Sequence, residues 1–345
     1  MGPRFRMLLS VVVVLVATGL LVPASVAGQS ADDGWTLPRT PDGHPDLGGV
    51  WANNSATPLE RPEAWADKER LTDEELAALL VASEDAVGDG DALFGDQLVL
   101  AAIAGIEATS YDPTTGNYNQ FWIAERDFDN RTSLVIDPPA GRIPDLTPEA
   151  QERRRDGVAR RDEHPADTYT DRPLQERCVS YGVPRLGAGY NSYYQLFQSV
   201  DHVVFLNEMI HDARVIPIDG QPHLADRVRQ LHGDSRGHWD GDTLVVETRN
   251  FTDRTASFSP SVRSSIGTGT TLHLTERFSR LDADTLLYEF TVDDAASFTG
   301  PFTAALPMKR GGAPMFEYAC HEGNYGMLNL LSGARAQENA EASQP

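Results

Sequence analysis

The fold is decided by an alternating stretch late in the chain, Thr271–Arg280, which reads TLHLTERFSR. From 272 to 278 its even-numbered positions carry three apolar residues and Glu276, whereas the odd-numbered positions are polar. Successive side chains of a strand point to opposite faces, so this pattern predicts a strand with one apolar face. The next run, Thr285–Asp293, alternates in the same way after the turn sequence Asp282-Ala283-Asp284. Together they predict two neighbouring antiparallel strands.

Glu276 is the exception on the apolar face of the first strand. If that face points to the interior, the carboxylate must pair with another group or bind a ligand, because burying an uncompensated charge is costly. The alternative is a place at the rim of the sheet.

Similar short runs surround this pair. They are apolar, aromatic or β-branched, and they cover 194–199, 202–210, 214–218, 236–239, 243–251, 302–309 and 315–320. Asp240-Gly241, between two of them, is typical of a tight hairpin turn. A meander of about eight or nine such strands closes most economically into a barrel, which removes exposed edges. We therefore expect a mainly β fold, an antiparallel meander that closes into a lipocalin-like β-barrel with accessory N-terminal helices.

The N-terminus predicts export. Arg4 and Arg6 precede an apolar run over 7–22 and a small-residue cleavage region, which is the pattern of a secretory signal peptide over 1–28. No later run is long enough to span a membrane, so we expect no stable membrane insertion after cleavage. The expected location is the periplasm or the extracellular space.

Between the signal peptide and the barrel, residues 29–176 are predicted to form a segment that packs on the barrel. A capping box at Thr72–Glu75 and an N-cap at Thr147 begin two helices. The runs 119–124 and 131–136 are predicted to form a β-hairpin. We assign the barrel domain to 177–333 and a disordered tail to 334–345.

Charge and cysteine content narrow the class of protein further. The chain has 51 acidic and 29 basic residues, a net charge of −22, which disfavours binding to a nucleic acid. Cys178 and Cys320 are the two cysteines, and in an exported chain they predict one disulfide. Two separate buried thiols are the alternative. Neither cysteine belongs to a CxxC pair of the kind that binds zinc.

Two polar clusters interrupt the apolar runs. The first, Asn207–Arg214, reads NEMIHDAR, and the second, Glu317–Tyr325, reads EYACHEGNY. We expect the first at a corner of the barrel mouth, with the second brought to it by the disulfide. The predicted catalytic residues are His211, Asp212, His321 and Glu322. The predicted ligand-binding residues are Glu208, Arg214, Glu276, Asn324 and Tyr325.

Several kinds of chemistry fit these residues. A histidine beside carboxylates can act as a general base, and Arg214 could hold a carboxylate or pair with Asp212. Glu208, His211 and His321 are the candidate ligands of a divalent metal; no other cofactor is predicted. A purely structural corner, held by hydrogen bonds, explains the same residues. Gly233–Gly237 also matches the GxSxG pattern of serine hydrolases, but a hairpin follows it where a helix is required.

Several longer motifs resemble one family. They are Arg39–Trp51 (RTPDGHPDLGGVW), Arg131–Pro139, Gly233–Gly237, Trp239–Val246 (WDGDTLVV) and Cys320–Gly326 (CHEGNYG). With these motifs the mature chain resembles a largely uncharacterised family of exported proteins from soil and other environmental bacteria. That resemblance implies export and no established activity. Gly49-Val50-Trp51 also resembles the GxW start of lipocalin-like barrels.

The sequence therefore predicts an exported β-barrel protein whose partner is a small organic molecule, with acid–base chemistry at the barrel mouth. The alternatives are a non-catalytic periplasmic binding or envelope module and a metal-dependent hydrolase.

Overall fold

The computed structural model describes residues 34–88, 90–109, 121, 123–186, 189–253, 270–312 and 314–343. The predicted signal peptide, 1–28, lies outside these described residues. Among the helices that the structure describes, none combines the length and the apolar character needed to cross a membrane.

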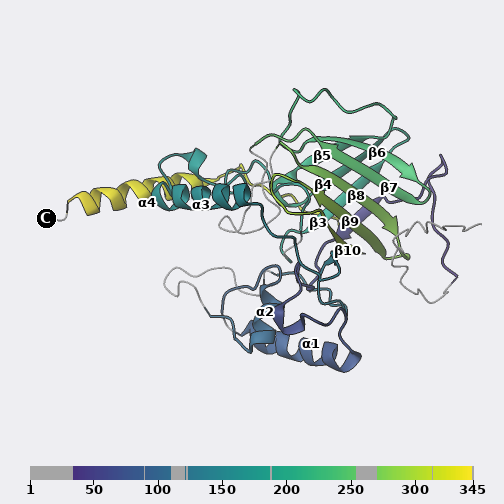
Figure 1. Ribbon diagram of the computed structural model, residues 1–345, viewed down its shortest axis with the longest axis horizontal. Coiled ribbons are helices and arrows are strands. Elements are labelled where there is room, and N and C mark those ends of the chain that lie inside the picture. The colour runs from purple at the N-terminus through teal and green to yellow at the C-terminus, as the bar shows by residue number, and fades with distance from the viewer. Residues whose placement is uncertain are drawn as a thin grey trace, which may run out of the picture. The chain divides into compact units, whose positions relative to one another are not determined.

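A barrel-like antiparallel sheet of nine consecutive strands dominates the structure (Figure 1). The strands are β1 (Gly49–Ala52), β3 (Tyr193–Gln198), β4 (His202–Asn207), β5 (Ala213–Pro217), β6 (Asp234–Asp240), β7 (Thr243–Arg249), β8 (His273–Arg280), β9 (Thr285–Asp293) and β10 (Phe302–Arg310). Their order is β5-β4-β3-β1-β10-β9-β8-β7-β6, and the short strand β2 (Val135–Asp137) also pairs with β10. The prediction of a mainly β, barrel-like meander with accessory helices is confirmed.

The seam of the barrel lies between β5 and β6. Eight antiparallel pairings along nine strands mean that the first and last strands run in the same direction, so antiparallel pairing cannot continue across the seam. In the described residues no ladder joins β5 to β6, although the two strands lie in contact. Gly237 permits this approach, because a Cβ at this position would lie 2.6 Å from Ile218 Cγ2 and 3.2 Å from Ile216 Cγ2.

The alternating faces predicted for the strands define the interior. Along β8, residues 274, 276 and 278 are buried and their neighbours are not, and β9 alternates in step with it. Inside, the rings of Phe278 and Tyr288 stack with centroids 4.8 Å apart, and Phe205 lies 4.6 Å from Phe278. Burying one such side chain contributes about 1.5–3 kcal/mol to folding.

Strand β1 places Trp51 in the core. Trp51 is fully buried and its indole Nε1 donates to the Leu47 carbonyl at 2.9 Å. The guanidinium groups of Arg280 and Arg310 lie 4.9 and 4.6 Å from the centroid of its ring. Because β1 pairs with both β3 and β10, the barrel takes one strand from the segment that was expected to pack outside it.

The described residues also form four α-helices. In chain order they are α1 (Asp73–Val87), α2 (Gln97–Ala104), α3 (Pro148–Glu163) and α4 (Tyr325–Ala342). The predicted caps are present at the start of α1 and α3: Thr72 closes a capping box with Glu75, and Thr147 accepts from the backbone of Ala150. Among the described residues, the two runs 119–124 and 131–136 do not pair as the predicted hairpin. Half of its first run, 119–124, falls outside the described residues, and β2, from the second run, pairs with β10 instead.

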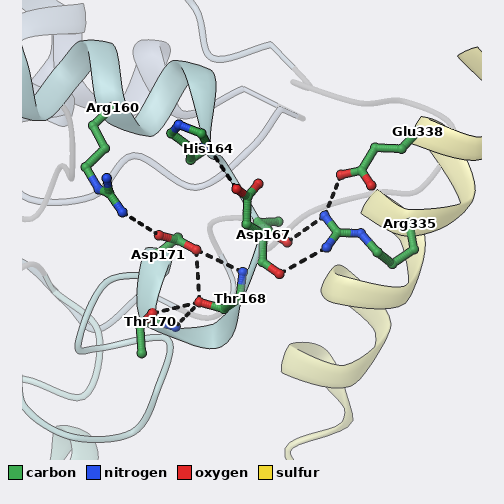
Figure 2. Close-up of polar contacts among 9 residues, drawn as sticks. Arg160, His164, Asp167, Thr168, Thr170, Asp171, Arg335 and Glu338 are labelled. Carbon is green, nitrogen blue, oxygen red and sulfur yellow. Dashed lines mark hydrogen bonds and ion pairs between the residues drawn. The ribbon is translucent and has the colours of Figure 1, made fainter. Parts of the chain in front are cut away.

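The C-terminal end differs from the prediction. Residues 334–342, expected as part of a disordered tail, form the second half of α4. The helix begins at an N-cap in which Asn324 accepts from the backbone of Met327, and its alanine, leucine, glutamate and glutamine residues favour helix. Arg335 connects α4 to the segment that follows α3. It donates to the carbonyls of Ala166 and Asp167, each at 3.0 Å (Figure 2).

Candidate functional site

A pocket lies between the interior face of the barrel and several connecting segments of the chain. It contains about 450 Å³ of empty space, counting the part open to solvent. The strands contribute Tyr194, Phe205, Asn207, Arg214, Glu276, Phe278, Tyr288 and Met308. The connecting segments contribute Gly182, Val183, Arg185, Asp212 and His232.

A buried ion pair forms the inner wall of the pocket. Glu276 is 2% exposed, and its Oε2 accepts from Arg214 Nη2 at 2.5 Å while its Oε1 accepts from the Tyr288 hydroxyl at 2.8 Å. Burial raises the pKa of Tyr288 well above its ordinary value of 10.0, and the negative charge of Glu276 raises it further. The hydroxyl therefore stays protonated and donates. Glu276 does point inward and is paired, and Arg214 pairs with it rather than with Asp212.

Asp212 and His232 form a second polar pair at the pocket. Asp212 Oδ2 lies 3.7 Å from His232 Nε2, and the same nitrogen is 2.5 Å from Ser180 Oγ. Burial raises the pKa of Asp212 and lowers that of His232, although each charge partly offsets the shift of the other. Burial therefore shifts the two pKa values toward each other.

This pair is not a serine-protease-like relay. In such a relay the aspartate and the serine contact opposite nitrogens of the imidazole, whereas here both approach Nε2. Ser180 is fully buried and its Oγ also accepts from the backbone of Gly182 at 2.9 Å. Ser180 is therefore a positioning group for His232.

Arg185 crosses the outer side of the pocket. Its Nη1 donates to the Met209 carbonyl at 3.2 Å, its Nη2 donates to the Asn191 carbonyl at 3.0 Å, and the guanidinium lies over the ring of Tyr181. The residue is 6% exposed. In the described part of the chain, no carboxylate lies within ion-pair distance of it, although its charge lowers the pKa of both Asp212 and Glu208 at longer range.

Four buried polar atoms at or beside the pocket have no hydrogen-bond partner among the described residues. They are Arg185 Nε, Asn207 Oδ1, Glu208 Oε2 and Arg214 Nε. Twelve buried side-chain atoms lack a partner among the described residues, and these four of them lie around one pocket. Buried donors and acceptors are nearly always paired in native proteins, so these four are groups that a polar ligand could pair.

The corner between β4 and β5 positions Asp212. Ile210 and His211 have φ values of 65° and 48°, a left-handed conformation that is costly for residues other than glycine and most of all for a β-branched one. Ile210 is buried, and Arg185 holds the adjacent Met209 carbonyl. The packing that enforces this conformation turns the Asp212 side chain toward the pocket.

The disulfide brings the two polar clusters together. Cys178 and Cys320 are bonded, with an S–S distance of 2.02 Å, as predicted. The rings of His211 and His321 also lie close together, with centroids 5.5 Å apart and an angle of 48° between their planes. Both histidines are exposed and neither lines the pocket.

The remaining predicted residues lie in three places. Asp212, Arg214 and Glu276 line the pocket, and Glu208 is buried beside it. Glu322 and Tyr325 are exposed, whereas Asn324 caps α4 and donates to Cys178 Sγ at 3.3 Å. In the described ranges no three histidine, cysteine or acidic side chains are grouped as a metal site would require.

Sequence reasoning missed Arg185 and His232. Each lies in a connecting segment whose sequence has no periodic pattern. The sequence therefore shows one polar residue in each segment and does not indicate that its side chain lines a pocket. Ser235, the central residue of the GxSxG match, is buried in β6 and its hydroxyl shares a hydrogen bond with Thr248. It offers no accessible nucleophile.

The fold and the pocket define a barrel-like protein with a partly enclosed cavity that apolar and charged side chains line. No protein-family model, curated protein or solved structure matches this chain.

Proposed function

We propose that this chain is an exported barrel protein that binds a small organic molecule in the pocket beside Arg214 and Glu276. The observation that carries the proposal is the set of unpaired buried polar atoms around one cavity. Purely structural corners pair their buried groups internally, because each unpaired one costs about 1–3 kcal/mol. A bound molecule with polar groups would supply the missing partners.

The apolar wall of the pocket suits a flat, partly apolar body. Phe205, Phe278 and Tyr288 present stacked or tilted rings at its inner side, and Met308 adds an adaptable thioether. A ligand that combines an aromatic or alicyclic body with one or two polar groups matches both walls.

Export is supported by the disulfide, which persists in oxidising compartments, together with the signal-peptide pattern of the N-terminus. Membership of the exported bacterial family suggested by the terminal motifs agrees with this location and is part of the proposal.

Proton transfer on the bound molecule is the second candidate function. Asp212 and His232 support it, since burial shifts their pKa values toward each other and both line the pocket. A suitable reaction is removal of a proton from a carbon beside a carbonyl, followed by its return. Deuterium exchange into the methylene group of phenylpyruvate tests this: the protein should accelerate it, and His232→Gln should abolish the acceleration. Equal rates with and without protein would contradict catalysis and leave a binding module.

Binding itself is tested with benzyl alcohol, a neutral aromatic probe, by ligand-observed NMR. Asn207→Trp places a large side chain in the pocket lining and should abolish saturable binding. Val200→Trp is the matched control, because Val200 lies in the connection between β3 and β4 and is 71% exposed. Absence of saturable binding, or equal binding to Asn207→Trp, would contradict the proposal.

A further inference from the structure

We infer that the polar group recognised in this pocket is a carboxylate, held between the guanidinium groups of Arg185 and Arg214. The inference rests on the proposed function and specifies its ligand as a small organic acid with an aromatic or apolar body.

Arg185 is a buried cation in the lining of the pocket. A guanidinium remains charged at any physiological pH, and buried charges in proteins are paired or coordinate a counter-ion. Arg185 is 6% exposed and donates to two neutral carbonyls, and within the described chain it forms no ion pair with a carboxylate. Its Nε is buried without a partner. An anionic ligand in the pocket would complete its coordination.

Arg214 lines the same pocket. Glu276 accepts from one terminal nitrogen and holds the guanidinium in place, while the buried Nε has no partner in the described residues. Both oxygens of Glu276 are already occupied, by Arg214 and Tyr288. Glu276 therefore orients Arg214 without using all of its donors. Planar arginine groups bind carboxylates with good geometry when they are held in this way.

Two acidic groups lie near this site. Burial raises the pKa of both Asp212 and Glu208, although the charge of Arg185 lowers both, and Asp212 Oδ2 lies 3.7 Å from His232 Nε2. Asn207 adds a side-chain amide that can donate to a carboxylate oxygen. The rings of Phe205, Phe278 and Tyr288 then face the apolar body of the acid.

The test compares benzoate with benzamide, which has the same size and no charge. Their dissociation constants are measured by ligand-observed NMR on the full chain. Charge-assisted hydrogen bonds should make benzoate bind at least about tenfold more tightly than benzamide. Arg185→Gln should remove that preference, and Arg185→Lys, which keeps the charge but loses the planar fork, should reduce it.

Arg277→Gln is the matched control. Arg277 precedes Phe278 on β8 but lies on the outer face, where it pairs with Asp240 and is 42% exposed. The benzoate preference should be unchanged in this variant. For Arg214, Arg214→Lys is the informative change, because it preserves a cation beside Glu276 and should weaken benzoate binding while the fold is retained.

The outcomes separate the two proposals. If benzamide binds as tightly as benzoate and both are lost in Asn207→Trp, the carboxylate inference is overturned and small-molecule binding stands. If neither probe binds saturably, small-molecule binding is overturned as well. A benzoate preference that survives Arg185→Gln would overturn the assignment of Arg185.

Discussion

Arg214 on β5 and Glu276 on β8 form an ion pair across the interior of the barrel, with Arg214 Nη2 2.5 Å from Glu276 Oε2. β5 is one edge strand of the sheet and β6 is the other. In the sheet, β8 is separated from β6 by one strand, β7. The pair therefore joins the two sides of the barrel at the seam that no backbone ladder closes in the described residues. Since both residues line the pocket, the same ion pair also forms part of the pocket wall.

Replacing Glu276 by glutamine should destabilise the protein by about 3–5 kcal/mol, because it leaves the buried Arg214 cation without its counter-ion. Urea unfolding followed by circular dichroism measures the change. The triple variant Arg214→Met/Glu276→Leu/Tyr288→Phe should recover most of the loss, since a buried pair can be replaced by apolar side chains at little cost once the Tyr288 hydroxyl, which donates to Glu276, is removed as well.

The surface pair Arg277–Asp240 provides the comparison. Its side chains are 42% and 65% exposed, and Arg277→Gln should change the free energy of unfolding by about 1 kcal/mol or less. If Glu276→Gln costs no more than Arg277→Gln, the buried pair does not have the structural role assigned to it.

Loss of the disulfide should lower the free energy of unfolding by about 2–5 kcal/mol, because it closes a long loop in the unfolded chain. The sequence separation of Cys178 and Cys320 is 142 residues. The measurement is urea unfolding of the Cys178→Ser/Cys320→Ser double variant against the parent protein. Reductant should destabilise the parent and leave the double variant unchanged; equal sensitivity would argue against a structural disulfide.

The barrel and the disulfide could be predicted because their signals are local and repetitive. Alternation in β8 and β9 and a tight turn at Asp240-Gly241 each specify short-range geometry, and two cysteines allow one intramolecular pairing. Glu276 stood out in the sequence because it interrupts an apolar face, but a paired interior position and a position at the rim of the sheet both remained open. Its partners were not, since Arg214 and Tyr288 approach it through the tertiary fold.

The rest of the site depends on how the connecting segments lie against the interior face of the barrel. Arg185 and His232 lie in segments without a regular pattern, and sequence spacing gives no information about where their side chains point. The octapeptide Asn207–Arg214 was correctly recognised as a corner. Its strained conformation turns Asp212 toward the pocket and leaves His211 outside with His321, a division that no pattern of residue types indicates.

The stability of the protein should depend on pH through His232. Burial lowers its folded-state pKa below the ordinary value of 6.5, so below pH 6.5 the unfolded chain binds more protons than the folded one. The free energy of unfolding should fall as the pH decreases through this window. The raised pKa of Asp212 acts oppositely, since its contribution decreases as the pH rises above 3.8.

His232→Gln should therefore flatten the dependence of the unfolding free energy on pH between about 7.5 and about 5. His238→Gln, which removes an exposed histidine of β6, controls for the loss of one imidazole. NMR titration of His232 should give a midpoint below 6.5; a midpoint above that value, or an unchanged slope in His232→Gln, would refute the assignment.

His211→Gly should stabilise the protein by about 0.5–1 kcal/mol. Glycine adopts the left-handed backbone conformation of this position without the steric cost that a residue with a Cβ atom has there. The same substitution at His238, in extended strand β6, should destabilise by a similar amount. Thermal unfolding of both variants tests the difference in sign. Since His211 lies outside the pocket lining, binding of benzyl alcohol should be unchanged in His211→Gly.

The central claim is that the cavity at Arg185, Arg214 and Glu276 is the binding site, and mapping of backbone amide shifts on addition of benzoate tests it most directly. We predict that the largest shifts fall on Gly182, Val183, Asn207 and His232, and that they disappear in Asn207→Trp. Shifts centred on His211, His321 and Glu322, with the pocket residues unaffected, would contradict the claim and move the site to the exposed histidine pair.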